Sequence, residues 1–448
     1  MSKVKQCDVA IIGGGISGTA LLYLLSRYTD LSRVCLLEKC DDIAMLNSHG
    51  RHNSQTLHCG DIETNYTLEK AIEVKASADM VVRYLARHPH YQHILHKYPK
   101  MVIGVGDREC DLLRQRFQQF KPHYPSMKLF EAEDIQRIEP RVMEGRKESI
   151  VALGVEDDYT AVDFQALAKS FVEQAQAVRD KRVDVMLGTR VGKIEAVGEA
   201  YRLDTSQGVI EARFVVVSAG SHSLLFAQGM GYGLKYSCLP VAGSFYYAPS
   251  VLNGKVYTIQ NDVLPFAAIH GDLDVLVADK TRFGPTALIL PMLERYNFST
   301  IPDYLRVLRL DMNVLKVLWD LFRVADIRNY MFKNILFEVP LIRRRLFLRD
   351  VKKIIPGMRL SHLKFAKKIG GIRPVMIDKL KQKLHLGEAK IDTGKGIIFN
   401  MTPSPGATSC LGNGVKDVEV IVEYLGCAYD KERLHADLMV SENPGPGA

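Results

Sequence analysis

The sequence predicts an α/β fold in which a Rossmann-like domain, split along the chain, is joined to an α+β domain with a mainly antiparallel sheet. First, the short apolar segment 9–12 runs into three glycines and then into apolar residues at helical spacing over 17–28. Second, residues 34–37 form another short apolar segment, so strand, helix and strand make a βαβ unit with a parallel sheet. Third, short segments punctuated by glycine, proline and asparagine over residues 236–276 favour an antiparallel sheet.

The remaining elements follow from the same periodicities. Helices are predicted over 68–87, 162–176 and 415–425, strands over 183–187, 191–195, 213–218 and 395–400, and a mostly helical, basic segment over 305–348. The last eight residues, SENPGPGA, are rich in proline and glycine, so we expect them to be disordered.

Length and composition are typical of a globular enzyme. The 448 residues can bury a large core spread over two domains, and 47% hydrophobic with 25% charged residues is ordinary. No apolar run reaches about 18 residues, so we expect no membrane span. The N-terminus has no long apolar region and leads directly into Val9–Ile12, so we expect no signal peptide. Eight scattered cysteines without a CxxC pair indicate a reduced, cytoplasmic chain. The moderate charge gives no support for nucleic-acid binding.

Positive charge is concentrated in one segment. Residues 301–370 contain sixteen Lys or Arg and six Asp or Glu, a net charge of +10 against +8 for the whole chain. A solvated basic face is one interpretation. The other is a surface attracted to anionic lipid, because apolar and basic residues alternate at helical spacing there, as in helices that lie on membranes.

The glycines after the first strand form a phosphate-binding loop. Gly13, Gly15 and Gly18 fit the G-x-G-x-x-G pattern, in which the backbone approaches a pyrophosphate at the start of a helix. Glu38 follows Gly18 by twenty positions, where a carboxylate accepts the ribose hydroxyls of NAD or FAD. The residues expected to bind the cofactor here are Gly13, Gly15, Ile16, Ser17, Gly18, Glu38 and Lys39.

Several further stretches resemble one superfamily. They are NSHGRHNSQTLHCGDIETNYT, FVVVSAGSHS, CLPVAGSFYY, LPFAAIHGD, GPTALILP, GIRP and NMTPSPGATSC, in this order along nearly the whole chain. Together with the opening they resemble FAD-dependent oxidoreductases of the D-amino-acid-oxidase-like superfamily, and most closely the shorter bacterial form of the malate:quinone oxidoreductases. The Asn-Ser-x-x-x-His-x-Gly pattern at residues 53–60 is also similar to L-2-hydroxyglutarate dehydrogenases.

The resemblance implies FAD as cofactor and a discontinuous domain to hold it. Residues 1–85, 150–232 and 370–430 would form the FAD-binding domain, and 86–149 with 233–369 the substrate domain. A basic helical segment over about 301–368 would face the membrane, and 431–448 would form a carboxyl-terminal tail.

The resemblance also implies which further residues contact FAD. Asn53, Ser54 and Gln55 would line the isoalloxazine, Val191 the adenine, and Ala219 with Gly220 would approach the nucleotide. Gly406, Ala407 and Thr408 would open the last helix, whose amino end would stabilise the negative charge of the reduced flavin.

The implied reaction is oxidation of (S)-malate to oxaloacetate by hydride transfer from C2 to flavin N5, with the electrons passed to a membrane quinone. The protein would lie peripherally on an anionic lipid surface, at the cytoplasmic face of the inner membrane. Two alternatives remain open: an FAD enzyme acting on L-2-hydroxyglutarate or L-lactate, and a flavoprotein used for binding or redox sensing.

This chemistry needs a cation for the substrate carboxylate and a base for its hydroxyl proton. We expect Arg373, in the GIRP segment, to bind the carboxylate, with Arg282 or Lys280 for a second one. His270, with Asp272 nearby, is the first candidate for the base and His58 the second. No metal site is predicted, because the histidines 88, 90, 93 and 96 lack completing ligands and Pro89 interrupts them.

Overall fold

The computed structural model describes residues 4–260, 268–385, 388–402 and 405–439. Its parallel sheet has the order β22, β11, β1, β2, β8, with strands Ile397–Met401, Gly208–Val217, Lys5–Ile12, Arg33–Leu37 and Arg182–Met186. β21 (Ala389–Asp392) extends this sheet antiparallel beside β22, and the hairpin of β9 (Val191–Val197) and β10 (Ala200–Thr205) extends it beside β11. The predicted βαβ unit is therefore present, with three further parallel strands beside it.

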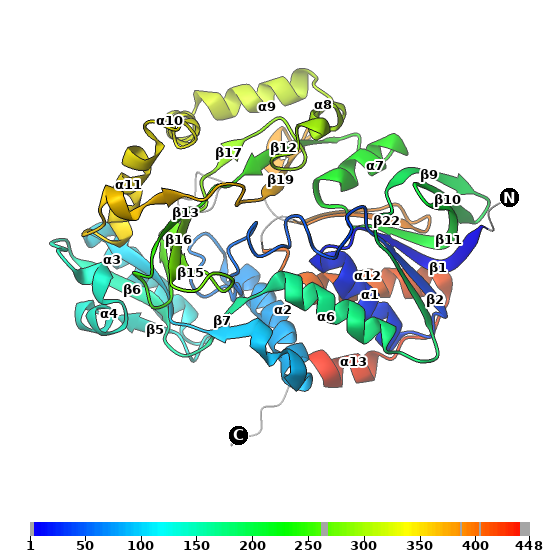
Figure 1. Ribbon diagram of the computed structural model, residues 1–448, viewed down its shortest axis with the longest axis horizontal. Helices are drawn as coiled ribbons and strands as arrows, with labels where there is room; N and C mark the ends of the chain where they lie inside the picture. The colour runs from blue at the N-terminus through cyan, green and yellow to red at the C-terminus, as the bar shows by residue number, and fades with distance from the viewer. Residues whose placement is uncertain (1–3, 261–267, 386–387, 403–404, 440–448) are drawn as a thin grey trace.

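Three helices cover one face of this sheet. α1 (Ile16–Tyr28) lies between α6 (Phe164–Gln176) and α12 (Cys410–Leu425), and their apolar side chains form one core with β1 and β2. α2 (Leu68–Arg87) and α13 (Lys431–Leu438) pack beyond them (Figure 1). The expected tail from residue 431 thus begins as a helix, and SENPGPGA lies outside the described residues.

The second part of the molecule is mainly antiparallel, as predicted. An eight-stranded sheet has the order β18, β13, β16, β15, β14, β4, β6, β5, with strands Lys364–Phe365, Tyr246–Pro249, Lys280–Gly284, His270–Leu273, Lys255–Thr258, Lys100–Val105, Ile150–Val155 and Lys128–Phe130. Only the β14–β4 pair in this sheet is parallel among the described residues. The fold class predicted from the sequence is confirmed.

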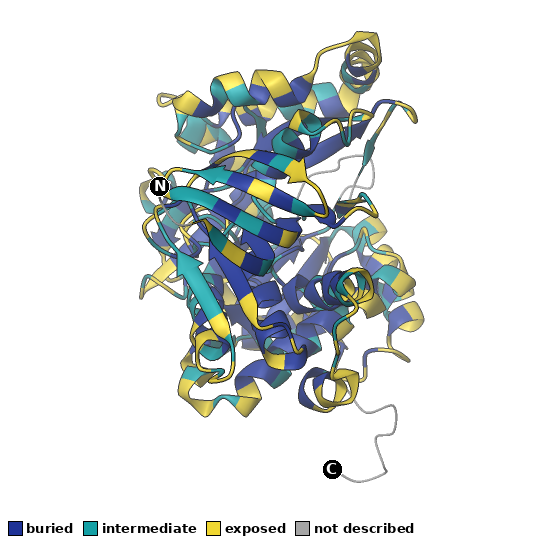
Figure 2. Ribbon diagram, turned by 90° about the vertical axis from the view of Figure 1, so that its right-hand side faces the viewer, coloured by how far each residue is buried: buried dark blue, intermediate teal, exposed yellow. Residues whose placement is uncertain are grey.

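A smaller sheet connects the two parts. Its order is β17 (Leu288–Ile289), β12 (Tyr236–Ala242), β19 (Ile372–Asp378) and β20 (Lys383–His385), all antiparallel. The other elements are α3 (Asp107–Phe120), α4 (Ala132–Ile138), α5 (Pro140–Met143), α7 (Ser223–Gly229) and the pair β3 (Leu95–Lys97) and β7 (Tyr159–Val162). The most deeply buried residues follow the strands and their covering helices, as Figure 2 shows.

The basic segment forms four helices rather than one continuous run. They are α8 (Ile301–Leu308), α9 (Met312–Arg323), α10 (Ala325–Leu336) and α11 (Arg343–Ile354). α8, α9 and α10 lie along one outer edge of the molecule, above β17 and β12 in Figure 1. Within the described part of the chain, no helix is both long and apolar enough to cross a membrane.

Candidate functional site

One large cavity connects the two parts of the molecule. It has a volume of about 670 Å³ and is lined by the β1–α1 turn, by the ends of β2 and β9, and by β19 of the small sheet. Its lining includes Gly13, Glu38, Val191 and Arg373, which are more than 350 positions apart at the extremes. Residues predicted to bind FAD and substrate therefore share one continuous space.

The β1–α1 turn has the geometry of a phosphate-binding loop. Gly13 has φ +113°, and a Cβ atom on it would overlap the carbonyl oxygen of Ser218, just after the neighbouring strand β11. A Cβ on Gly18 would overlap the carbonyl oxygen of Gly13. Gly15 lines the cavity at the N-cap position of α1, where it has no side chain to shield the helix N–H groups. These glycines leave the amino end of α1 accessible to a pyrophosphate.

Substituting Gly18 by Ala is expected to weaken FAD binding at least tenfold. The added methyl group would overlap the carbonyl oxygen of Gly13 and displace the loop, and such overpacking costs about 1–3 kcal/mol. The measurement is the FAD content of the purified protein, followed by titration of the apoprotein with FAD. Gly357→Ala is the matched control, since the nearest atom to its added Cβ is 3.8 Å away. Equal FAD content in both variants would contradict the assignment of the loop.

The carboxylate of Glu38 is fixed where the second strand ends. Its two oxygens accept hydrogen bonds from the backbone N–H of Gly14 at 2.6 Å and of Cys40 at 2.8 Å, and it lines the cavity. Lys39 also lines the cavity and forms an ion pair with Glu294. The acid is thus placed as a ribose acceptor should be, next to the glycine turn.

The remaining predicted cofactor residues fall into two groups. Those that line the cavity are Ile16, Ser17, Asn53, Ser54, Val191, Ala219, Gly220, Gly406 and Ala407. Gln55 and Thr408 do not line it. The Gln55 amide is fully buried and donates to the oxygens of Gly50 at 3.1 Å and Asp274 at 3.0 Å. The Thr408 hydroxyl accepts from the N–H of His58 at 3.1 Å.

The helix expected to open at Gly406 begins later in the chain. Residues 405–409 form a turn, α12 starts at Cys410, and α13 follows it, so α12 is not the last helix. The N–H of Ser409 donates to the carbonyl oxygen of Pro405 at 3.1 Å, which closes this turn. The cavity therefore meets the turn before α12 rather than the helix itself.

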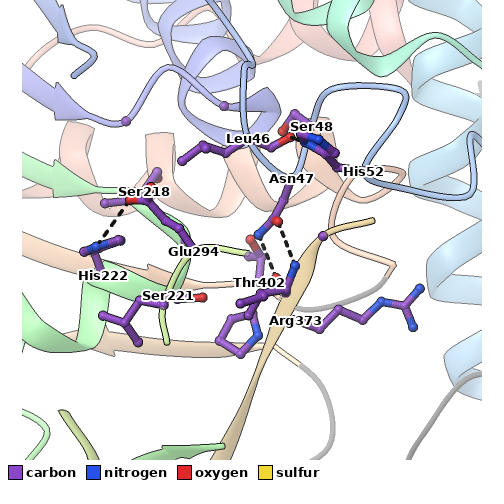
Figure 3. A pocket seen from close by; sticks show the side chains of 18 of the residues that line it. Leu46, Asn47, Ser48, His52, Ser218, Ser221, His222, Glu294, Arg373 and Thr402 are labelled. Carbon is purple, nitrogen blue, oxygen red and sulfur yellow. Dashed lines mark hydrogen bonds and ion pairs between the residues drawn. The ribbon is translucent and has the colours of Figure 1, made fainter. Parts of the chain in front are cut away.

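Arg373 reaches the cavity from β19. Burial lowers its pKa, and the phenol groups of Tyr257 and Tyr66 oppose this effect. No carboxylate forms an ion pair with it within the described ranges. Figure 3 shows its side chain extending away from the strand. A half-buried guanidinium without a carboxylate partner is suited to bind an anionic ligand.

Asn47 holds the strand that carries Arg373, and sequence reasoning missed it. Its side-chain amide donates to the carbonyl oxygen of Ile372 at 2.7 Å and accepts from the same residue's N–H at 3.1 Å (Figure 3). Asn47 is the first residue of the NSHGRHNSQ stretch, so its position in a stretch of family resemblance was the available signal. The two bonds fix the loop of residues 47–55 to the base of the substrate site.

His58 lies in the cavity wall, paired with a buried acid. Its Nδ1 is 2.6 Å from Oε1 of Glu63, which leaves Nε2 to act in the cavity. Burial raises the pKa of Glu63, but the hydrogen bond and charge of His58, together with the charge of Lys100, lower it by more, so the net shift is downward. A histidine oriented by an ionised carboxylate is the arrangement of a general base.

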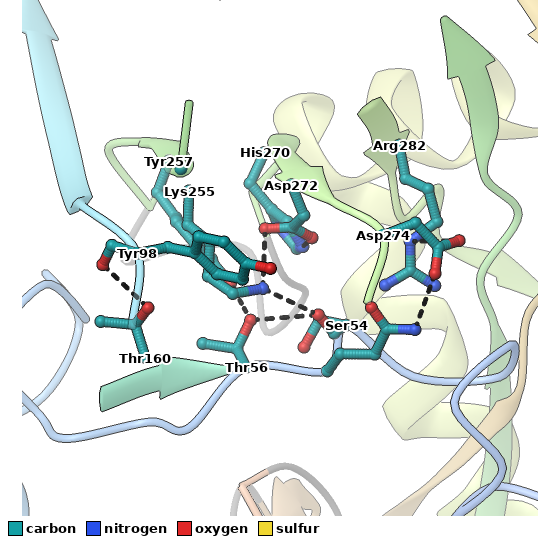
Figure 4. A network of polar contacts seen from close by, with 12 residues as sticks. Ser54, Thr56, Tyr98, Thr160, Lys255, Tyr257, His270, Asp272, Asp274 and Arg282 are labelled. Carbon is teal, nitrogen blue, oxygen red and sulfur yellow. Dashed lines mark hydrogen bonds and ion pairs between the residues drawn. The ribbon is translucent and has the colours of Figure 1, made fainter. Parts of the chain in front are cut away.

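His270 lies behind the wall instead. It is 2% exposed and does not line the cavity, its Nε2 is 3.1 Å from Asp272, and its Nδ1 is 3.1 Å from the Ala268 oxygen. Lys255 joins this buried network through Asp272 at 3.4 Å and donates to the Ser54 oxygen at 3.1 Å (Figure 4). Burial lowers the pKa of Lys255 to about 8. His270 therefore belongs to a buried network that contacts the loop at Ser54 through Lys255.

The arginine expected to bind a second carboxylate is also engaged in the core. Arg282 is fully buried outside the cavity lining, with Nη1 3.1 Å from the Gly50 oxygen and Nε 3.5 Å from Asp274 (Figure 4). Lys280 is exposed. Arg295, which sequence reasoning missed, does line the cavity, 3.5 Å from Glu338.

Comparisons with known proteins agree with this geometry. A family model described as FAD dependent oxidoreductase matches residues 8–415. A probable malate:quinone oxidoreductase of Campylobacter jejuni is 47% identical over 97% of this chain and 99% of its own length. A malate:quinone oxidoreductase of Helicobacter pylori is 45% identical over 98% of this chain and 99% of its own.

Solved structures share the fold at low identity. L-α-glycerophosphate oxidase from Mycoplasma pneumoniae, solved with FAD bound, superposes with a TM-score of 0.64 at 18% identity, over 93% of this chain and 95% of that one. Glycine oxidase from Geobacillus kaustophilus gives a TM-score of 0.63 at 15% identity, over 99% and 100%. The match to the family model confirms FAD as the cofactor, and the glycine turn and Glu38 fit it.

Proposed function

Because this chain belongs to the malate:quinone oxidoreductases within the FAD-dependent oxidoreductase family, we propose that it oxidises (S)-malate to oxaloacetate and delivers the electrons to a membrane quinone. The observation that carries the proposal is the shared cavity. Arg373 and His58, whose ring is paired with the buried Glu63 behind it, line the same space as the phosphate-binding turn. An anion-binding group and a base therefore both border the space that holds the cofactor.

The two side chains have complementary tasks in this proposal. Arg373 binds the C1 carboxylate of the substrate through two parallel hydrogen bonds and so orients C2. His58 accepts the proton of the C2 hydroxyl through Nε2, and the carboxylate of Glu63 stabilises the resulting imidazolium. FAD supplies the acceptor for the hydride that leaves C2 at the same time. The substrate thus loses one proton and one hydride, which gives the 2-oxo acid.

The test is anaerobic bleaching of the flavin absorption band by a panel of (S)-malate, L-lactate and L-2-hydroxyglutarate. We expect malate to bleach the band fastest. Bleaching by one of the other two acids but not by malate would reassign the substrate. A protein whose FAD no 2-hydroxy acid reduces would overturn the proposal as a whole.

The acceptor determines where the protein must work. A long-chain quinone is dissolved in the bilayer, so the protein has to reach a membrane surface, which we place at the cytoplasmic face of the inner membrane. The net charge of +10 over residues 301–370 supports peripheral association with anionic lipid.

A further inference from the structure

An unusual share of the molecule's exposed apolar surface belongs to one segment. Of the twenty-five large apolar side chains exposed in the described ranges, thirteen lie in residues 305–342. They are Leu305, Leu310, Met312, Leu315, Trp319, Phe322, Val324, Phe332, Ile335, Leu336, Val339, Leu341 and Ile342, and we call them the docking face. Soluble proteins rarely expose so dense a set of large apolar side chains without a partner.

Three aromatic rings tie the two central helices of the docking face together. The ring centroids of Trp319 and Phe322 on α9 are 6.3 Å apart, and those of Phe322 and Phe332 on α10 are 6.2 Å apart. The three side chains are 60%, 40% and 53% exposed. Trp319 is the only tryptophan of the chain, and tryptophan favours the boundary between lipid and water.

The acidic residues of this segment are mostly neutralised. Four of the six carboxylates in residues 301–370 form ion pairs, namely Asp303 with Arg306, Asp311 with Lys379, Glu338 with Arg295 and Asp350 with Lys333. Exposed cations such as Arg323 and Arg345 border the docking face. Twelve of the sixteen cations in residues 301–370 are exposed, so most of the positive charge of this segment is accessible to an anionic surface.

α11 plays a different part from the one its sequence suggests. Arg343 stacks on the ring of Phe365 at 3.8 Å, and Arg344 donates to the carbonyl oxygen of Leu360 at 2.6 Å. On the same helix Phe347 and Val351 are fully buried. Two cations of α11 thus support the fold. The docking face is therefore confined to α8, α9, α10 and the turn that follows α10.

The inner side of α10 supports the cavity wall. Asn334 accepts a hydrogen bond from the N–H of Ala287 at 2.7 Å, and Glu338, just after α10, pairs with Arg295. Both Ala287 and Arg295 line the cavity. The outer side carries Phe332, Ile335 and Leu336 of the docking face. The inner side of α10 therefore packs on residues of the cavity wall, and its outer side belongs to the docking face.

We propose that the docking face inserts into one leaflet of an anionic phospholipid bilayer, so that α10 separates the lipid from the cavity. The inference rests on the proposed function only for the reason a bilayer is needed, which is the lipid-soluble acceptor. The apolar side chains enter the acyl boundary, and the surrounding cations meet the phosphate headgroups. The bilayer that holds the quinone then lies against the outer side of α10, whose inner side packs on the cavity wall.

The experiment uses the FAD-loaded full chain and vesicles of phosphatidylcholine with or without phosphatidylglycerol. We expect sedimentation with the anionic vesicles and a blue shift of tryptophan fluorescence, which reports Trp319 alone. Brominated lipids should quench this fluorescence. Trp319→Ser/Phe322→Ser/Phe332→Ser should lower vesicle affinity at least tenfold, because each ring removed is a large buried apolar area. Malate-dependent reduction of a water-soluble dye should stay unchanged.

Two further variants test the inference at side chains whose substitution should not disturb folding. Met312→Asp and Leu341→Asp change side chains that are 78% and 89% exposed, so they leave the packing intact and should still weaken vesicle binding. Ile72→Ser/Val197→Ser is the matched control on α2 and β9, with 42% and 53% exposure, and should bind like the unaltered protein.

Several outcomes would overturn the inference. They are absence of binding to anionic vesicles, equal binding by the docking-face and control variants, and a dimer in solution that the triple substitution dissociates. The last would assign the face to a second copy of the chain. Failure of malate to bleach the flavin, with vesicle binding intact, would refute the proposed function and leave the docking face standing.

Discussion

His58→Ala is expected to lower the rate constant for anaerobic flavin reduction by malate about 10²- to 10⁴-fold, the usual contribution of a general base. Only a side chain at the cavity wall can take the substrate proton, and His58 lies there, 2.6 Å from Glu63. The measurement is stopped-flow absorbance of the flavin over a range of malate concentrations. The malate concentration at half-saturation should change little, because in the proposed arrangement Arg373, and not His58, binds the carboxylate.

The comparison with His270 separates the two candidate bases. His270→Gln removes the ion pair with Asp272 at 3.1 Å, so it should lower thermal stability. Since His270 does not line the cavity, the folded, FAD-loaded fraction should keep a reduction rate within a few-fold of the unaltered protein. A large loss of rate in this variant, with His58→Ala still active, would return the base to His270.

The pH dependence provides an independent readout. A protonated imidazole cannot accept the substrate proton, so the rate should fall as the pH decreases. The pKa of Glu63 is shifted downward, which favours the charged carboxylate that faces the imidazole. Glu63→Gln should move this acid limb to lower pH, since a neutral amide stabilises the imidazolium less. An unmoved limb would mean that Glu63 does not orient the base.

Local pattern was sufficient for the nucleotide loop but not for the substrate site. Gly13, Gly18 and Glu38 lie within one βαβ unit, so their spacing fixes their relation in space. The base depends on contacts between distant segments. Whether His58 or His270 faces the cavity is decided by how β15 pairs with β14 and β16, which sequence spacing does not reveal.

Other differences between the predicted and the observed site also arise from contacts between segments that are distant in sequence. Gln55 has φ +55°, and its amide turns to Asp274, 219 positions away, while its neighbours Asn53 and Ser54 stay at the cavity. Arg282 pairs with that same Asp274. A single buried carboxylate thus engages two predicted site residues in the core. Charge patterning located the basic segment, but only the packing of α11 shows which of its cations support the fold.

Arg373→Met is expected to lower kcat/KM for malate about 10²- to 10³-fold, because removing one partner of a buried charged hydrogen-bond pair costs about 2–5 kcal/mol. The guanidinium has no ion pair within the described residues, so its loss leaves no buried acid unpaired and should not unfold the protein. Arg373→Lys keeps the charge without the two parallel donors, so its kcat/KM should lie between that of Arg373→Met and that of the unaltered protein. The measurement is steady-state malate oxidation with a water-soluble dye, alongside FAD content.

The substrate panel shows whether the lost interaction is with the C1 carboxylate. Malate, lactate and 2-hydroxyglutarate all carry this group, so Arg373→Met should weaken any of them that the unaltered protein oxidises by a similar factor. Lys280→Met is the matched control, since that cation is exposed and lies outside the cavity lining, and it should leave kcat/KM unchanged. A variant at Arg373 that keeps its malate kcat/KM would place the carboxylate elsewhere in the cavity, with Arg295 the next cation to test.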